Sequence, residues 1–227
     1  SDPSREVPLV HVDDVVEAFV SEVRSQESGV RDQESGGRGQ RSAVSGQKSG
    51  VIYREVQPIY TVTLGRLAEL IRSFRESRHS LVVPDFSDPF THKLYGTFLS
   101  YLDPGDFAYD LAQRADNRGA LAEFVKSPPF GQIFVSRTRP GVTRGHHFHH
   151  TKTEKFLVVE GEAIIRFRHI RGGDVMEYRV RGEDFRVVDI PTGYTHSIEN
   201  VGSGELVTLF WASQVFDPNQ PDTFYEE

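Results

Sequence analysis

Cysteine is absent from this chain of 227 residues, which excludes disulfides, thiolate nucleophiles and cysteine metal ligands. Long apolar runs are absent as well. No stretch approaches the roughly 18 residues that a membrane-spanning helix needs, so we expect no membrane partner. The opening residues, Ser1 to Arg5, contain no apolar signal region, which favours a cytoplasmic protein. The net charge of −7 argues against nucleic-acid binding and requires a local basic pocket for any anionic substrate.

Residues 24–50 lack a regular apolar spacing. The segment reads RSQESGV, RDQESGG, RGQRSAV and SGQKSG, a degenerate repeat of about seven residues. A coiled coil would need apolar a and d positions, which are missing, and glycine recurs instead. Because Ser, Gly, Gln and charged side chains bury too little surface to offset the entropy of ordering, we predict a disordered insertion.

Strand and helix patterns flank this insertion. Before it, Leu9, Val10 and Val12 indicate a short strand, and Asp13 is placed to cap a helix that begins at Asp14. The predicted apolar face of that helix consists of Val15, Val16, Phe19 and Val20.

After the insertion, residues 51–62 are rich in strand-forming side chains. Thr63 is placed to cap a helix over residues 64–75, and a second helical stretch covers 89–101. Asp103-Pro104-Gly105 then ends the helical pattern.

From Gly131 onward, strand-like runs alternate with turn residues at a spacing of about 8–12 residues. The runs cover residues 133–136, 155–159, 163–168, 177–180, 185–190 and 206–211. This rhythm predicts an all-β sandwich or barrel of about 120 residues, whose closed form is a jelly roll.

Four histidines fall within the five residues 146–150. Side chains alternate between the two faces of a strand, so His147 and His149 share one face. His146 and His150 point to the other face, although a bulge would change this assignment.

A carboxylate and a third imidazole complete a candidate metal site. Glu154 follows the histidines across a turn, and His196 comes much later in the chain. Three imidazoles and one carboxylate suit a divalent first-row metal and leave coordination positions open for water or substrate. We prefer zinc, although iron, manganese, nickel and cobalt fit the same ligands.

The spacing of these residues resembles the two motifs of the cupin family. The first motif, G-x5-H-x-H-x4-E-x6-G, matches Gly141, His147, His149, Glu154 and Gly161. The second, P-x-G-x2-H-x3-N, matches Pro191, Gly193, His196 and Asn200. The glycine that usually leads the second motif is Phe185 here, which indicates a longer turn. The resemblance implies a double-stranded β-helix jelly roll, and fold alone does not identify the reaction.

The resemblance extends beyond the metal motifs. Residues 116–124 are similar to the start of nucleotide-sugar epimerase and isomerase cupins, and residues 7–20 are similar to the tail of an extended short-chain dehydrogenase. Residues 64–103 resemble the segment that joins the two halves of bifunctional UDP-4-keto-6-deoxy-N-acetylhexosamine 3-epimerase/4-reductases of capsular polysaccharide synthesis. Their N-terminal half is an NADPH-dependent reductase, and their C-terminal half is a metal-binding cupin.

This resemblance implies four segments. Residues 1–23 and 51–103 are pieces of the reductase domain, 24–50 are the insertion, and 104–227 form the cupin epimerase domain. No G-x-x-G-x-x-G turn is present, and no Tyr is followed four residues later by Lys. Nucleotide binding and hydride transfer need those residues, so we expect neither NADP binding nor dehydrogenase activity.

The activity implied for the cupin is metal-dependent inversion of carbon 3 of a UDP-linked 4-keto-6-deoxy-N-acetylhexosamine. Three side chains are candidates for the group that transfers the proton: Tyr194, Lys152 and His150. Tyr194 is close to His196 in the sequence, and Lys152 is close to Glu154. For each of the three, a role in packing or at the surface is the alternative. Arg144 is the preferred ligand for substrate phosphate, and Arg137 and Arg139 share a strand face that is placed to help.

Two other classes of function fit the same residues. One is a different cupin enzyme, either a dioxygenase or a keto-sugar isomerase. The other is a non-catalytic module that binds a sugar nucleotide or holds a dimer together. We expect a homodimer, because cupins of this kind commonly pair.

Overall fold

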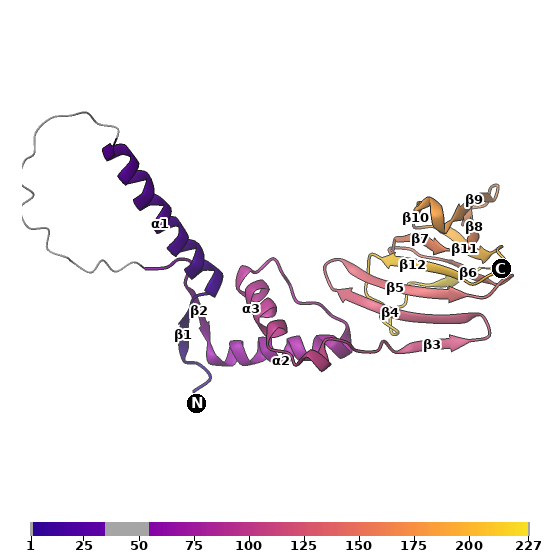
Figure 1. The fold of residues 1–227 in the computed structure, drawn as a ribbon. Helices are drawn as coiled ribbons and strands as arrows, with labels where there is room; N and C mark the ends of the chain where they lie inside the picture. The colour runs from indigo at the N-terminus through magenta and orange to yellow at the C-terminus, as the bar shows by residue number, and fades with distance from the viewer. Residues whose placement is uncertain (1, 35–54, 227) are drawn as a thin grey trace, which may run out of the picture. The chain divides into compact units, whose positions relative to one another are not determined.

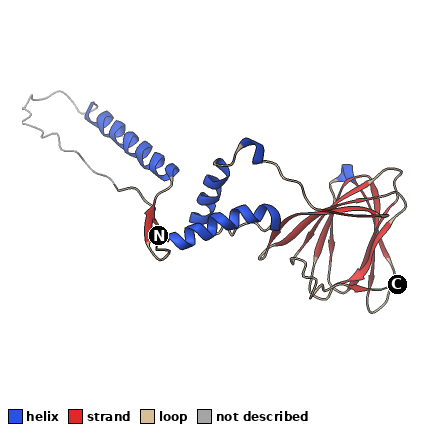
Figure 2. Ribbon diagram, turned by 90° about the horizontal axis from the view of Figure 1, so that it is seen from below, coloured by secondary structure: helices blue, strands red, loops and turns tan. Residues whose placement is uncertain are grey.

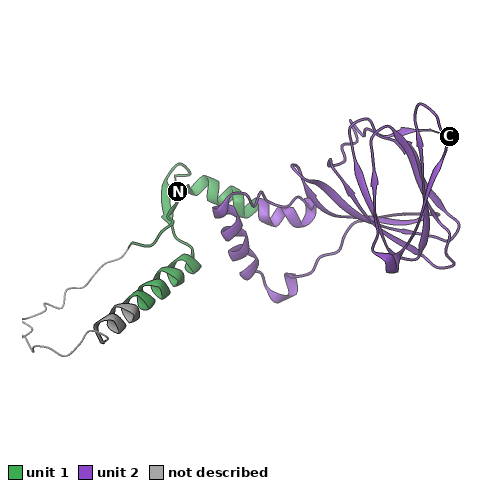
Figure 3. Ribbon diagram, turned by 90° about the horizontal axis from the view of Figure 1, so that it is seen from above, with its two compact units in different colours: residues 1–72 green, residues 73–227 purple. Residues whose placement is uncertain are grey.

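The computed structural model describes residues 2–34 and 55–226 (Figure 1). The chain forms two compact units, residues 1–72 and residues 73–227, which Figure 3 colours separately. Among the described residues, none of the helices has the length and apolar character needed to cross a bilayer.

The first unit contains a small antiparallel ladder and a long helix. Strand β1 (Glu6–Leu9) pairs with β2 (Tyr60–Thr63), and helix α1 (Val12–Glu34) follows β1. Asp13 and Asp14 lie in the first turn of α1, where negative charge interacts favourably with the helix dipole. The predicted apolar face of this helix is exposed, and Phe19 is 70% accessible.

Helix α1 corrects part of the prediction for residues 24–50. It continues to Glu34, whereas we expected disorder from residue 24 onward. Arg, Gln and Glu are good helix formers, and extending an existing helix avoids the cost of nucleation. Residues 35–50 of the predicted insertion, and 51–54 of the strand-rich stretch, lie outside the described residues.

The predicted helices after the insertion are confirmed. Helix α2 (Leu64–Ser80) is longer than predicted, and the Thr63 hydroxyl accepts a hydrogen bond from the N–H of Arg66 as its cap. Helix α3 (Pro89–Ser100) begins after Asp88, whose carboxylate accepts hydrogen bonds from backbone N–H groups of the first turn. A short 3-10 turn, η1 (Pro104–Asp106), ends the helical region.

The rest of the second unit consists of two antiparallel sheets (Figure 2). The six-stranded sheet has the order β10-β7-β12-β5-β4-β3, and the five-stranded sheet has the order β13-β6-β11-β8-β9. The strands of the first are β3 (Gln113–Asp116), β4 (Gly119–Ser127), β5 (Gly131–Thr138), β7 (Glu154–Glu160), β10 (Val187–Ile190) and β12 (Leu206–Ala212). Those of the second are β6 (Thr143–Phe148), β8 (Glu162–His169), β9 (Met176–Arg181), β11 (Tyr194–Asn200) and β13 (Phe224–Tyr225).

Both sheets contribute to one hydrophobic core. Alternate residues of the strands point inward, as period-2 patterning requires. Phe156 and Phe210 come from the six-stranded sheet, and Ile165 and Ile198 come from the five-stranded sheet. The mainly β prediction is therefore confirmed, and each of the six predicted runs overlaps a strand, although residues 185 and 186 precede β10.

The departure from the second cupin motif has a backbone explanation. A 3-10 turn, η2 (Gly182–Asp184), precedes Phe185, whose φ of 46° lies in the left-handed region. Glycine adopts this conformation without a steric penalty, which accounts for its usual presence at this place in the motif.

Candidate metal centre

A β-bulge sets the direction of the first histidine of the candidate centre. In the ladder between β6 and β11, His196 lies opposite His147. The next pair joins Ser197 to Gly145, so His146 has no partner in this ladder and forms the bulge. His146 has a φ of 58° and is exposed, while His147 points between the sheets.

Gly145 allows the two strands to approach each other. Its φ is 107°, and a Cβ atom at this position would lie 2.6 Å from the carbonyl oxygen of His196. Any larger residue would push β6 away from β11. The close approach leaves the rings of His147 and His196 with centroids 4.6 Å apart.

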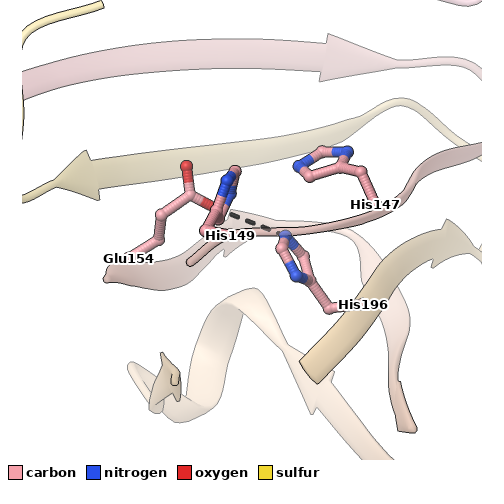
Figure 4. Close-up of side chains that lie close together, drawn as sticks. All are labelled: His147, His149, Glu154 and His196. Atoms are coloured by element: carbon pink, nitrogen blue, oxygen red, sulfur yellow. Dashed lines mark ion pairs between the residues drawn. The ribbon is translucent and has the colours of Figure 1, made fainter. Parts of the chain in front are cut away.

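The structure brings the four predicted ligands together. His149 follows β6, and Glu154 opens β7 in the other sheet. One potential ligand atom from each of His147, His149, Glu154 and His196 lies within 4.8 Å of all the others (Figure 4). The Nε2 atoms of His149 and His196 each lie 3.4 Å from Oε2 of Glu154.

The electrostatics of the cluster keep His147 and Glu154 in the protonation states that metals bind. Burial, reinforced by His196 and His149, lowers the pKa of His147 to about 4. Burial alone would raise the pKa of Glu154, but its interactions with His149 and His196 lower it to about 2. The carboxylate is therefore ionised and the His147 imidazole is neutral at pH 7.

The hydrogen bonds of two imidazoles leave their Nε2 atoms available to a cation. Nδ1 of His149 faces the carbonyl of Asp222 at 2.5 Å, and Nδ1 of His196 faces the carbonyl of Tyr194 at 3.2 Å. A carbonyl only accepts, so each Nδ1 atom carries a proton, and Nε2 is the nitrogen that each ring has left to offer a metal. These buried Nε2 atoms make no hydrogen bond and face a carboxylate. A divalent cation would satisfy all three groups, so the residues fit a metal.

A cavity of about 290 Å³ opens onto the cluster. Its lining comes from both sheets and combines apolar, basic and metal-ligating side chains. The residues are Arg118, Leu121, Phe134, Ser136, Arg144, Gly145, His147, Glu154, Phe156, His196, Ile198, Phe210 and Tyr225. This metal-side pocket has the size and mixed character of a small-molecule site.

Two arginines give the metal-side pocket its positive charge. Nε of Arg144 donates to the hydroxyl of Thr138 at 3.0 Å. Burial and the neighbouring Arg118 lower the pKa of Arg144. Asp116 holds Arg118 through two hydrogen bonds, of 3.0 and 2.7 Å, to one carboxylate oxygen. The two guanidinium groups are thus fixed in place beside the cluster.

The structure places the three predicted proton-transfer candidates outside the lining of the metal-side pocket. Tyr194 lines a separate cavity of about 460 Å³, and its ring packs edge-on against His169. The buried Lys152 ammonium donates to the carbonyl of Pro221. His150 is exposed and contacts aromatic rings at the surface.

Arg137 and Arg139 also lie away from the metal-side pocket. Arg137 is exposed on the outer face of β5, where it pairs with Glu205, and Arg139 follows the strand and is exposed too. Of the three predicted phosphate ligands, only Arg144 lines the pocket.

Three residues at the centre were missed by the sequence analysis. Arg118 and Tyr225 line the metal-side pocket, and the carbonyl of Asp222 contacts Nδ1 of His149. Arg118 lies in the segment similar to epimerase cupins, so that resemblance contained a usable signal. Tyr225 and Asp222 follow no motif, and only long-range strand pairing brings them to the site.

The amino-acid sequence is similar to a protein-family model and to two bacterial proteins. Residues 114–224 match a family model described as the polysaccharide biosynthesis C-terminal domain. The chain is 37% identical over 221 residues to a UDP-2-acetamido-2,6-beta-L-arabino-hexul-4-ose reductase of Pseudomonas aeruginosa, covering 97% of this chain and 54% of the relative. It is 25% identical over 122 residues to the spore coat polysaccharide biosynthesis protein SpsL of Bacillus subtilis, covering 49% of this chain and 81% of SpsL.

Solved structures of one protein resemble the whole chain. The crystal structure of the capsular polysaccharide assembling protein CapF from Staphylococcus aureus is 41% identical, with a TM-score of 0.83 over 100% of this chain and 56% of that one. CapF with the inhibitor 3-isopropenyl-tropolone gives 41% identity and a TM-score of 0.84, with 60% of that chain covered. The present chain thus spans little more than half the length of CapF and of the reductase.

Proposed function

We propose that this chain is a metal-dependent sugar-nucleotide enzyme of capsular or surface polysaccharide synthesis. Its reaction is inversion of carbon 3 of a UDP-linked 4-keto-6-deoxy-N-acetylhexosamine. The observation that carries the proposal is a cluster of three histidines and one glutamate that opens onto a pocket lined by two arginines. The polysaccharide family model over residues 114–224 supports the biosynthetic setting.

The name of the Pseudomonas relative supports the substrate class. It denotes a UDP-linked acetamido sugar with a ketone at carbon 4. A ketone acidifies the hydrogens on its neighbouring carbons, and carbon 3 is one of them. Removing that proton and returning one from the opposite face inverts the centre without a redox cofactor.

The cluster provides for the negative charge that develops on the ketone oxygen. His147, His149, Glu154 and His196 are the proposed ligands, with zinc as the preferred metal. When bound, the metal would supply a Lewis acid, and such charge stabilisation contributes several kcal/mol in other enzymes. Apolar side chains beside the cluster, among them Phe156 and Phe210, lower the local polarity and strengthen this interaction.

Tyr225 is the proton-transfer group that we now propose. Its ring centroid lies 5.8 Å from that of His147, and it lines the pocket that Tyr194 does not enter. A phenol beside the reacting carbon is able to give or take the proton. A positioned acid or base accelerates such steps about 10²–10⁴-fold.

Arg144 and Arg118 are the proposed ligands of the diphosphate. A guanidinium pairs with phosphate oxygens through two parallel hydrogen bonds. Because Asp116 and Thr138 already hold the two side chains, little conformational entropy is lost when the substrate binds.

The same proposal includes a jelly-roll fold for the β-rich part of the chain and a homodimer. Two antiparallel sheets around one core, with the metal cluster between them, are what a jelly-roll cupin requires.

For the homodimer, edge strand β9 offers exposed apolar side chains, among them Met176 and Tyr178. Sedimentation equilibrium with Tyr178→Glu tests this contact, since a charge there should produce monomers.

Metal analysis and proton exchange test the function together. The protein is assayed for bound metal, then mixed with the UDP-linked 4-keto sugar in deuterated water and followed by NMR. We expect deuterium uptake at carbon 3 that requires metal and is lost in His147→Ala. Movement of the carbonyl would indicate a keto-sugar isomerase, and binding without uptake would indicate a non-catalytic module. Oxidation of added NADPH would contradict our expectation that the chain has no reductase activity.

A further inference from the structure

The segment Pro221–Glu226 returns to the metal centre from far along the chain. Its strand β13 extends the five-stranded sheet beside β6, with Phe224 opposite Phe148 and Tyr225 opposite His147. The segment contributes Tyr225 to the metal-side pocket. We call residues 221–226 the C-terminal strap.

Asp222 in the strap organises the turn that joins two of the proposed ligands. Its Oδ1 accepts a hydrogen bond from the N–H of His150 at 2.9 Å. Its Oδ2 accepts from the N–H groups of Thr151 and Lys152, at 2.9 and 2.8 Å. The hydroxyl of Thr151 donates to the same oxygen at 2.9 Å. One carboxylate thus gathers three successive backbone N–H groups.

The backbone of Asp222 acts on a ligand directly. Its carbonyl oxygen accepts the proton of Nδ1 of His149. This contact fixes the imidazole tautomer and turns the Nε2 lone pair toward Glu154. The ring of His149 is 2% exposed, so no water competes for this hydrogen bond.

The strap holds Asp222 in an uncommon conformation. Its φ of 42° is left-handed, which aspartate and asparagine tolerate better than most residues. The ammonium of Lys152 donates to the carbonyl of Pro221 at 3.1 Å, so turn and strap hold each other. Burial would raise the pKa of Asp222, but the three N–H groups hold it well below its usual range.

We propose that Asp222 is a positioning residue of the metal centre. Its carboxylate folds the turn between His149 and Glu154, and its carbonyl sets the tautomer of His149. The lysine that sequence reasoning treated as a proton-transfer candidate thereby has a structural role in the same arrangement. This inference rests on the part of the proposed function that assigns a metal to the cluster.

The experiment compares Asp222→Ala and Asp222→Asn with the unmodified chain. Asparagine tolerates the left-handed backbone but offers one acceptor oxygen in place of two. Asp217→Asn is the matched control, because Asp217 is exposed on the same C-terminal stretch and, among the described residues, its side chain bonds to Asn219 alone. Zinc affinity is measured by competition with a chelator. Nitrogen-15 NMR of the histidine rings, in the metal-free protein, reports the tautomer of His149.

We expect Asp222→Ala to weaken zinc binding about 10–100-fold, as loss of outer-sphere support does elsewhere, with Asp222→Asn in between and Asp217→Asn unchanged. The Nδ1–H tautomer of His149 should give way to a mixture in Asp222→Ala. Zinc affinity within about twofold of the unmodified chain, together with an unchanged tautomer, would overturn the inference. If Asp222→Ala does not fold, Asp222→Asn decides by the same two measurements.

The two proposals fail in different ways. An unmodified chain that binds zinc but exchanges no proton at carbon 3 contradicts the epimerase function alone. A chain that binds no zinc contradicts the metal assignment, and the tautomer measurement still decides the role of Asp222.

Discussion

Nε2 of His196 lies 3.4 Å from Oε2 of Glu154, although the two residues belong to different sheets. His196 is on β11 of the five-stranded sheet, and Glu154 opens β7 of the six-stranded sheet. A cation bound between them would join the two sheets. We therefore expect metal binding at this cluster to raise the folding stability.

Zinc should raise the melting temperature of the chain, and Glu154→Gln should remove most of that increase. The substitution keeps the size of the side chain but removes its charge, so we expect zinc affinity to fall at least about 100-fold. Differential scanning calorimetry with and without zinc measures the effect. Glu160→Gln, on an exposed position of the same strand, is the control. An equal zinc-induced shift in both variants would count against Glu154 as a ligand.

The metal-free protein should lose stability as the pH falls from about 6.5 to about 4. In this window the unfolded chain protonates His147 and the folded chain does not, so the unfolded state binds more protons. Stability therefore rises with pH across the window. Urea unfolding in the presence of a chelator measures the slope, which should be shallower in His147→Gln. His79→Gln, at an exposed histidine, should keep the original slope, and equal slopes in all three proteins would refute the prediction.

Arg144→Ala should weaken the binding of UDP, whereas Arg137→Ala should not. Hydrogen bonds to charged groups contribute about 1.5–3 kcal/mol, which corresponds to a loss of about 10–100-fold in affinity. Arg144 lines the metal-side pocket, and Arg137 lies on the outer face of its strand. Isothermal titration calorimetry with UDP compares the two variants. A larger loss in Arg137→Ala would place the nucleotide on the other side of the sheet.

Tyr225→Phe should slow deuterium uptake at carbon 3 about 10²–10⁴-fold, with little effect on zinc affinity. The substitution removes the hydroxyl but keeps the ring beside His147. Tyr194→Phe is the matched control, because Tyr194 packs against the core and lines the other cavity. Loss of exchange in the control alone would return the catalytic role to Tyr194.

Phe185→Gly should leave stability unchanged or raise it by up to about 1 kcal/mol. A left-handed backbone costs a residue with a Cβ atom about 1–2 kcal/mol, while glycine loses about 0.5–1 kcal/mol through its greater freedom when unfolded. The Phe185 side chain is 73% exposed, so little packing is lost. Chemical denaturation measures the difference. A marked loss of stability would show that the exposed ring has a contact that outweighs the backbone strain.

Local patterns were sufficient to predict which four side chains lie together in the candidate centre. His147 and His149 share a face because strand side chains alternate, and the cupin spacings add Glu154 and His196. The bulge at His146 leaves this alternation intact, since it precedes both ligands. The strand runs and the helix caps are also short-range features, which explains why they could be predicted.

Long-range pairing decided the rest of the site. Sequence proximity suggested Tyr194 and Lys152, but Tyr194 packs against His169 and lines another cavity, and the Lys152 ammonium bonds to the strap. Tyr225 reaches the pocket only because β13 pairs with β6. No pattern within either strand specifies this pairing, so the residue that we propose for proton transfer could not be identified from the sequence.

Gly145 limits how this pocket can change in evolution or in the laboratory. Its missing side chain keeps β6 against β11, so a substitution there would disturb both histidine ligands before it altered any contact with a sugar. Leu121 and Phe134 line the same pocket from the other sheet and are only partly buried, whereas Phe210 belongs to the hydrophobic core. A library designed to accept a different ligand should therefore vary Leu121 and Phe134 and keep the glycine fixed.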